Sequence, residues 1–79
     1  MNEHRISPRH KVMKAATIEF DGGSVICVIR DLSISGAGLD VDNSAGIPDR
    51  FTLVLRTDGL HFSCRVAWRR ERQMGVAFD

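Results

Sequence analysis

The chain has 79 residues, of which 43% are hydrophobic and 27% are charged, with 11 lysines and arginines against 10 aspartates and glutamates. A chain of this length forms one domain, and its formal net charge of +1 argues against a general nucleic-acid or membrane-surface binder, because such proteins carry a large basic excess. Its apolar runs of only a few residues are also far too short to cross a membrane.

The first twelve residues alternate charged, proline and small polar side chains without a period, which predicts a flexible arm over residues 1–12 and a folded domain over residues 13–79. Apolar and polar side chains alternate from Met13 to Phe20, as in a half-buried strand, and Asp21-Gly22-Gly23 is typical of a hairpin turn. Residues 24–30 are rich in β-branched residues and apolar on both faces, as in a central strand.

Further strands are expected over residues 37–41, 51–56, 60–69 and 74–78. A connection rich in Asp, Asn, Ser, Gly and Pro occupies residues 42–49, and charged or glycine-containing turns occupy residues 57–59 and 70–73. The alternation over residues 60–69 is the clearest in the chain, and it predicts that Trp68 shares a face with Phe62, Cys64 and Val66.

These patterns describe about six short antiparallel strands and no helix. So small a sheet would leave two exposed edges and an open face, and closure into a barrel removes the edges. The fold class is therefore expected to be all-β, a six-stranded antiparallel barrel with a flexible N-terminal arm. The apolar residues expected to point inward are Ile18, Phe20, Val25, Cys27, Ile29, Leu39, Val41, Phe51, Leu53, Leu55, Phe62, Cys64, Val66, Met74, Val76 and Phe78.

Two arginines, Arg5 and Arg9, lie four residues apart on the arm, with Pro8 between them disfavouring a helix. Such a pair is often no more than solvated charge. Arginine also forks two hydrogen bonds onto a phosphate or onto the O6 and N7 atoms of guanine, which lysine does not do. The pair is therefore a candidate binding element for an anionic, guanine-bearing ligand.

A second polar segment, Asp31-Leu32-Ser33-Ile34-Ser35-Gly36, follows the central strand. One interpretation is structural: Asp31 and Ser33 cap a turn, and Gly36 supplies a positive φ. The other is functional: Asp31 accepts hydrogen bonds from the N1 and N2 atoms of guanine, Ser33 contacts a polar ligand atom, and Gly36 lets the backbone approach closely. From the residues alone, both interpretations stay open.

Other chemistry is weakly represented. Trp68 is either a packing residue or a stacking surface for a base. Cys27 and Cys64 lie in apolar strands and are expected to be buried thiols, and the absence of a leader sequence indicates a reduced, cytoplasmic protein. The three histidines are scattered, so no metal site is expected, and no catalytic motif is present.

In combination, the segments resemble the PilZ domain family of cyclic di-GMP receptors. The family pattern is Arg-x-x-x-Arg followed downstream by Asp/Asn-x-Ser-x-x-Gly, and the matching residues are Arg5, Arg9, Asp31, Ser33 and Gly36. The likeness continues through Gly36-Ala37-Gly38-Leu39 and through the closing segments Arg65-Val66-Ala67-Trp68 and Gly75-Val76-Ala77-Phe78. The likeness thus covers nearly the whole chain. Many members carry a helix after the barrel, whereas this sequence stops at Asp79, directly after the last expected strand.

The resemblance implies a bacterial, non-enzymatic receptor without a cofactor, whose arm closes over cyclic di-GMP and relays the signal to a protein partner in motility, biofilm or exopolysaccharide control. Arg5 and Arg9 would hold phosphates and guanine edges, and Asp31, Ser33 and Gly36 would hold a guanine. His4, at a position that varies in the family, is a candidate rim residue influencing how many ligand molecules bind. Neither a nucleic-acid polymer nor a membrane is an expected partner. The alternatives are a protein-interaction module with a vestigial ligand site and a small barrel that binds single-stranded nucleic acid.

Overall fold

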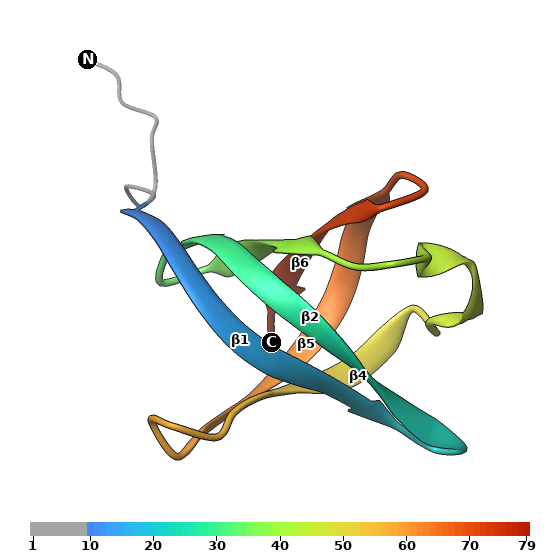
Figure 1. Cartoon of the computed structure of the whole chain (residues 1–79), viewed down its shortest axis with the longest axis horizontal. Coiled ribbons are helices and arrows are strands. Elements are labelled where there is room, and N and C mark those ends of the chain that lie inside the picture. The colour runs from blue at the N-terminus through green and yellow to red at the C-terminus, as the bar shows by residue number, and fades with distance from the viewer. Residues whose placement is uncertain (1–9) are drawn as a thin grey trace.

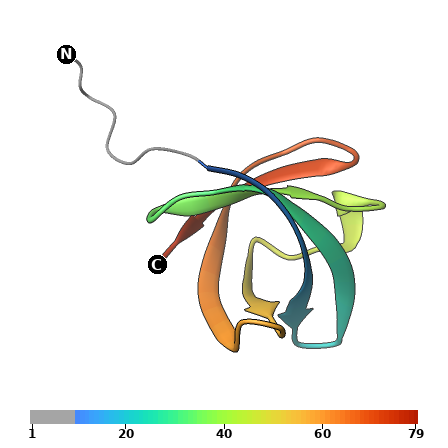
Figure 2. The same cartoon turned by 60° about the vertical axis from the view of Figure 1, so that its left-hand side comes forward.

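The computed structural model describes residues 10–79, which form a closed barrel of six antiparallel strands. The strands are β1 (His10–Phe20), β2 (Gly23–Leu32), β3 (Gly36–Asp40), β4 (Arg50–Leu55), β5 (Leu60–Arg69) and β6 (Gln73–Phe78), and a single 3-10 turn, η1 (Ser44–Gly46), lies between β3 and β4. Around the barrel the order is β1-β2-β3-β6-β5-β4, closed by pairing of β4 with β1. The hairpin of β1 and β2 is long and strongly bent (Figure 1), and the turned view shows the strands curving around a common interior (Figure 2). The expected fold class is confirmed.

The core follows from the alternation of the strands. Every residue expected to point inward is either buried or packed against the buried cluster. Ala16, Ala37 and Ile47 also belong to this cluster, although the pattern had not placed them in the inward set. Phe62 and Phe78 stack with ring centroids 4.5 Å apart. Within residues 10–79, no helix has the length and hydrophobicity needed to span a membrane.

The first strand begins at His10, three residues before the expected start at Met13. Residues 10–12 are therefore part of the barrel, and the expectation of an arm over residues 1–9 falls outside the described residues. The reason is a shift of register in the pairing of β1 with β2, between Lys11 and Lys14. This bulge interrupts the alternation of side chains, so the sequence pattern hides the first part of the strand.

A network of hydrogen bonds fixes the connection between β3 and β4. Arg69, at the end of β5, donates to the backbone oxygens of Ser44 and Ile47 and to the carboxylate of Asp49, the last at 2.9 Å. The buried Ser44 hydroxyl in turn donates to the backbone oxygen of Arg70. These contacts hold the turn between β5 and β6 in place, and with it the end of β5.

Candidate functional site

One row of residues crosses the outside of the barrel over five neighbouring strands. The pairing register places Lys11 of β1 opposite Asp31 of β2, and Asp31 opposite Gly38 of β3. Gly38 in turn lies opposite Gly75 of β6, which lies opposite Trp68 of β5. A carboxylate and an indole therefore stand at the two sides of a pair of glycines.

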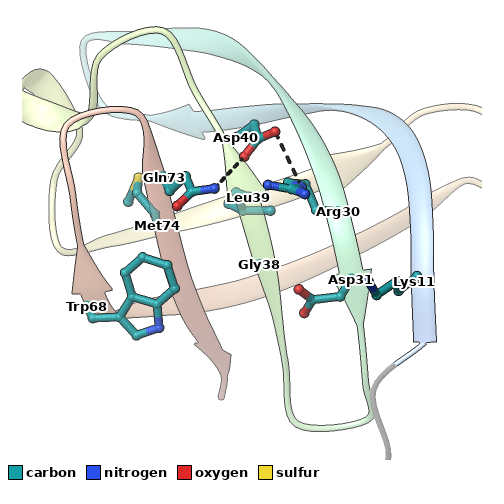
Figure 3. A pocket seen from close by; sticks show the side chains of 9 residues that line it. All are labelled: Lys11, Arg30, Asp31, Gly38, Leu39, Asp40, Trp68, Gln73 and Met74. Atoms are coloured by element: carbon teal, nitrogen blue, oxygen red, sulfur yellow. Dashed lines mark hydrogen bonds and ion pairs between the residues drawn. The ribbon is translucent and has the colours of Figure 1, made fainter.

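The two glycines give room for the side chains beside them. A β-carbon on Gly38 would lie 2.6 Å from Oδ2 of Asp31, so the carboxylate occupies the space above this glycine. A β-carbon on Gly75 would collide with the indole Nε1 of Trp68, so the indole lies over that glycine. Asp31 and Trp68 consequently lean toward each other across a floor of bare backbone, as Figure 3 shows.

Two bulges aim these side chains outward. In the pairing of β2 with β3, Ile29 is opposite Leu39 but Asp31 is opposite Gly38, which leaves Arg30 as an extra residue. In the pairing of β5 with β6, Val66 is opposite Val76 and Trp68 is opposite Gly75, which leaves Ala67 as an extra residue. An extra residue reverses the alternation of the residues that follow it.

The second bulge corrects the expectation that Trp68 shares a face with Phe62, Cys64 and Val66. Phe62 and Val66 are partly buried against the core, and Cys64 is buried, whereas Trp68 is 46% exposed on the outer surface. The strand alternates regularly up to Val66 and changes phase at the bulge. Bulges are not visible in a pattern of apolar residues, so the sequence alone did not predict this orientation.

The groove that results has a volume of about 290 Å³ and is called here the glycine groove. Its lining is mixed in charge, with two cations and two carboxylates around the bare strand backbone (Figure 3); the residues are Lys11, Arg30, Asp31, Gly38, Leu39, Asp40, Trp68, Gln73 and Met74. At the Trp68 side, the guanidinium of Arg70 lies over the indole, 5.4 Å from the ring centroid. The exposed indole thus accepts a flat, delocalised group against its ring.

Neither metal binding nor thiol chemistry has support in the described part of the chain. Among residues 10–79, no three His, Cys, Asp or Glu side chains gather closely enough to hold a metal ion. Burial raises the pKa of Cys27 to about 12 and that of Cys64 to about 11. Both thiols lie inside the barrel and stay protonated at neutral pH, so they are packing groups and not nucleophiles.

A model of the PilZ domain matches residues 3–79 of this sequence. The chain belongs to the PilZ domain family. PilZ domains are in general cyclic di-GMP-binding modules and not enzymes. A search of curated proteins found no match to the chain.

Within this PilZ domain, Asp31 and Ser33 have different local roles. Asp31, the last residue but one of β2, points into the glycine groove. Ser33 begins the β2–β3 turn, where its Oγ accepts hydrogen bonds from the backbone nitrogens of Ser35 at 3.3 Å and Gly36 at 3.2 Å. Ser33 therefore holds the turn. It lines a separate, apolar hollow and is not one of the described residues that line the glycine groove.

Gly36 is required for a reason that neither sequence interpretation named. Its φ is not positive; a β-carbon there would collide with the backbone oxygen of Val76 on β6. The close approach that Gly36 allows is therefore between β3 and β6. Together with Gly38 and Gly75, Gly36 is one of three glycines in the pairing of β3 with β6. The sequence motif included only Gly36.

Arg5, Arg9 and His4 fall outside the described residues, so the structure does not place them relative to the groove. The first described residue, His10, pairs with Leu32, next to Asp31 and Ser33. Arg9 is thus joined directly to a residue beside the second motif. Arg30, Gly38, Gly75 and Gln73 were not expected as site residues from the sequence. A signal for the two glycines was their lack of a side chain within expected strands.

Proposed function

We propose that this PilZ domain is a receptor that binds cyclic di-GMP in the glycine groove without catalysing a reaction. The observation that carries the proposal is the placement of Asp31 and Trp68 on opposite sides of a bare glycine pair. A purine is flat and fits against an indole, and a carboxylate accepts hydrogen bonds from the N1–H and N2–H₂ groups that guanine offers. Family membership supports the same ligand.

In this proposal, Arg5 and Arg9 supply the positive charge that the ligand's two phosphates require. The described lining of the groove is balanced, with Lys11 and Arg30 against Asp31 and Asp40, and does not by itself favour an anion. Arginine binds phosphate through paired, charge-assisted hydrogen bonds. The chain enters β1 at His10, which pairs with Leu32 beside Asp31. The few residues before it are enough for Arg5 and Arg9 to reach the groove and donate hydrogen bonds there.

Signalling follows from the same arrangement. Binding draws Arg5 and Arg9 onto the barrel, and the rearranged residues 1–9, together with the β2–β3 turn, form a surface that a protein partner distinguishes from the ligand-free one. Ordering a segment at the moment of binding costs conformational entropy, which limits affinity and keeps the response reversible. Motility, biofilm formation or exopolysaccharide synthesis in a bacterium is the proposed output, and the cytoplasm is the proposed location.

A fluorescence titration tests the binding directly, because Trp68 is the one tryptophan in the chain. Cyclic di-GMP is expected to change the Trp68 emission saturably, and GMP and GTP are not. Calorimetry should give the same affinity. Absence of binding in both measurements would reject the receptor and favour an interaction module with a vestigial site.

Variants then assign the groove. Arg5→Ala and Arg9→Ala are each expected to weaken binding by about tenfold or more, since each removes charge-assisted hydrogen bonds. Gly75→Ala should also weaken it by about tenfold, because a β-carbon there displaces the indole on which a base stacks. Gly46→Ala is the matched control, as nothing lies within 4 Å of a β-carbon at Gly46. Equal affinity in Gly75→Ala and Gly46→Ala would place the ligand elsewhere.

A further inference from the structure

The glycine groove contains a polar cluster that does not belong to either sequence motif. Arg30 forms an ion pair with Asp40, with Nε 3.6 Å from Oδ2, and Gln73 donates to the other oxygen of Asp40 at 3.5 Å. The cluster lies at the end of the groove above Asp31 and Gly38, as Figure 3 shows. All three side chains line the groove and come from three adjacent strands, β2, β3 and β6.

The bulge in β2 places Arg30 and Asp31 on the same face. Ile29 is buried, so regular alternation already directs Arg30 outward. Because Arg30 is an extra residue in the pairing with β3, Asp31 also lies outside instead of pointing into the core, and the Arg30 side chain is 51% exposed. The groove thus receives a guanidinium and a carboxylate from two consecutive residues of one strand.

Asp40 pairs with Nε of Arg30. The two terminal nitrogens of the Arg30 guanidinium therefore remain for another acceptor. Among residues 10–79, Asp40 is the one ion-pair partner of Arg30. The contact is long and half exposed, so it orients the side chain without fixing it. Arg30 therefore keeps hydrogen-bond donors that a bound molecule can use.

Adjacent donor and acceptor groups match one face of guanine. The Watson–Crick edge of guanine presents O6, which accepts, beside N1–H and N2–H₂, which donate. Adenine presents the opposite order at the same positions, with an amino group in place of O6 and an unprotonated N1. A carboxylate alone binds the donors of guanine but leaves O6 without a partner.

We infer that Arg30 donates to guanine O6 beside Asp31, adds to the selection of guanine over adenine in the glycine groove, and is positioned by Asp40. This inference rests on the proposed function, since it assumes that a guanine of cyclic di-GMP enters the groove. It goes beyond that function by assigning base selectivity to a residue outside the two motifs. Arg30 contacts the ligand, and Asp40 acts through Arg30.

The test compares cyclic di-GMP, the mixed cyclic GMP–AMP dinucleotide and cyclic di-AMP. They share the phosphates and differ in the base, since adenine has an amino group in place of O6 and lacks the N1 proton and the N2 amino group of guanine. Affinities are measured by Trp68 fluorescence and calorimetry for the wild type, Arg30→Met, Asp40→Asn and the control Arg56→Met. Arg56 is also an exposed arginine in a single ion pair, with Glu19, and it does not line the groove.

Arg30→Met is expected to weaken cyclic di-GMP binding by about tenfold or more and to reduce the preference over the two adenine-containing dinucleotides by a similar factor. Asp40→Asn should reduce the preference less, and Arg56→Met should leave affinity and preference as in the wild type. Equal weakening for all three dinucleotides in Arg30→Met would identify a phosphate contact and overturn the inference, as would an unchanged preference. A wild type that does not bind cyclic di-GMP would overturn the proposed function and the inference together.

Discussion

The pairing of β4 with the first half of β5 is regular, whereas the strands around the glycine groove are interrupted. From Arg50 opposite Arg65 to Leu55 opposite Leu60, the β4–β5 register runs without a shift. On the other side of the barrel, β2 and β5 each carry a bulge, and β3 and β6 meet through paired glycines. We call β4, the turn after it, the first half of β5 and residues 17–19 of β1 the regular wall, and the strands around the glycine groove the modified wall.

The difference shows how a small barrel forms a recess on its surface without a second domain. On the regular wall, side chains alternate, the inward ones fill the core, and exposed charges pair with one another, as Arg56 does with Glu19. On the modified wall, the bulges turn Asp31 and Trp68 outward, and Gly38 and Gly75 leave a recess between the side chains. Regular pairing thus leaves an even surface, and the departures from it create the groove.

The largest effect is expected on the regular wall. Leu53 in β4 is fully buried, and Leu53→Ala should lower the free energy of unfolding by about 3–4 kcal/mol, through lost apolar contact and the cavity left behind. Urea denaturation measures this change. The affinity of the folded variant for cyclic di-GMP should stay at the wild-type value; a parallel loss of affinity would contradict the separation of the two walls.

A smaller loss of stability is expected on the modified wall from Gly36→Ala. The new β-carbon meets the backbone oxygen of Val76, which cannot rotate away as a flexible side chain does, so β3 and β6 must separate locally. We expect a cost of about 2–3 kcal/mol in the free energy of unfolding. Gly46→Ala, where the β-carbon has open space, should be neutral or stabilising by up to about 1 kcal/mol. Similar values for the two variants would disprove the steric account.

The core that both walls share is expected to respond to alkaline pH. Burial raises the pKa of Cys27 from 9.0 to about 12 and of Cys64 from 9.0 to about 11. Above pH 9 the unfolded chain loses thiol protons that the folded protein keeps. The contribution of the thiols to the free energy of unfolding is therefore complete below pH 9, and it is lost as the pH rises toward 11 and 12. Between its unfolded and folded pKa values, each thiol should lower the free energy of unfolding by roughly 1 kcal/mol per pH unit.

Denaturation between pH 8 and pH 10.5 measures this slope, and tyrosine ionisation does not interfere because the chain has no tyrosine. The double variant Cys27→Ala and Cys64→Ala is the control, and its slope should be much shallower. An equally steep slope in the double variant would assign the effect to other groups.

The smallest effect is expected from the exposed charges of the regular wall. Arg56 and Glu19 lie 3.2 Å apart, with the arginine side chain 72% exposed. Solvent screens such a pair, and Arg56→Met should change the free energy of unfolding by no more than about 0.5 kcal/mol. A double-mutant cycle with Glu19→Gln measures the coupling. A coupling several times larger would show that the regular wall also depends on specific polar contacts.

Much of the barrel was predictable because its strands alternate apolar and polar residues. The inward set from Ile18 to Phe78 is confirmed, as is closure of the sheet. The errors lie at the bulges: the start of β1 before Met13 and the orientation of Trp68. Alternation has a period of two, and one extra residue changes its phase without changing the composition of the strand.

For the candidate site, the sequence left the roles of Asp31, Ser33 and Gly36 open between turn formation and ligand contact. Ser33 holds the turn through its hydroxyl, and Gly36 allows close contact of β3 with β6. Neither role depends on whether the residue also contacts a ligand. The assignments of Arg5 and Arg9 stay predictions, as does the number of ligand molecules influenced by His4.

The amino-acid sequence by itself determined the all-β class, the composition of the core and the membership of the PilZ family, because local alternation and motif spacing are properties of consecutive residues. The tertiary structure decided which strands are neighbours. Only pairing of β3 with β6 places Gly38 beside Gly75, and only the pairing of each with a bulged strand sets Asp31 and Trp68 at the two sides of the groove. These residues are distant in sequence, and the register of hydrogen-bonded strands brings them together.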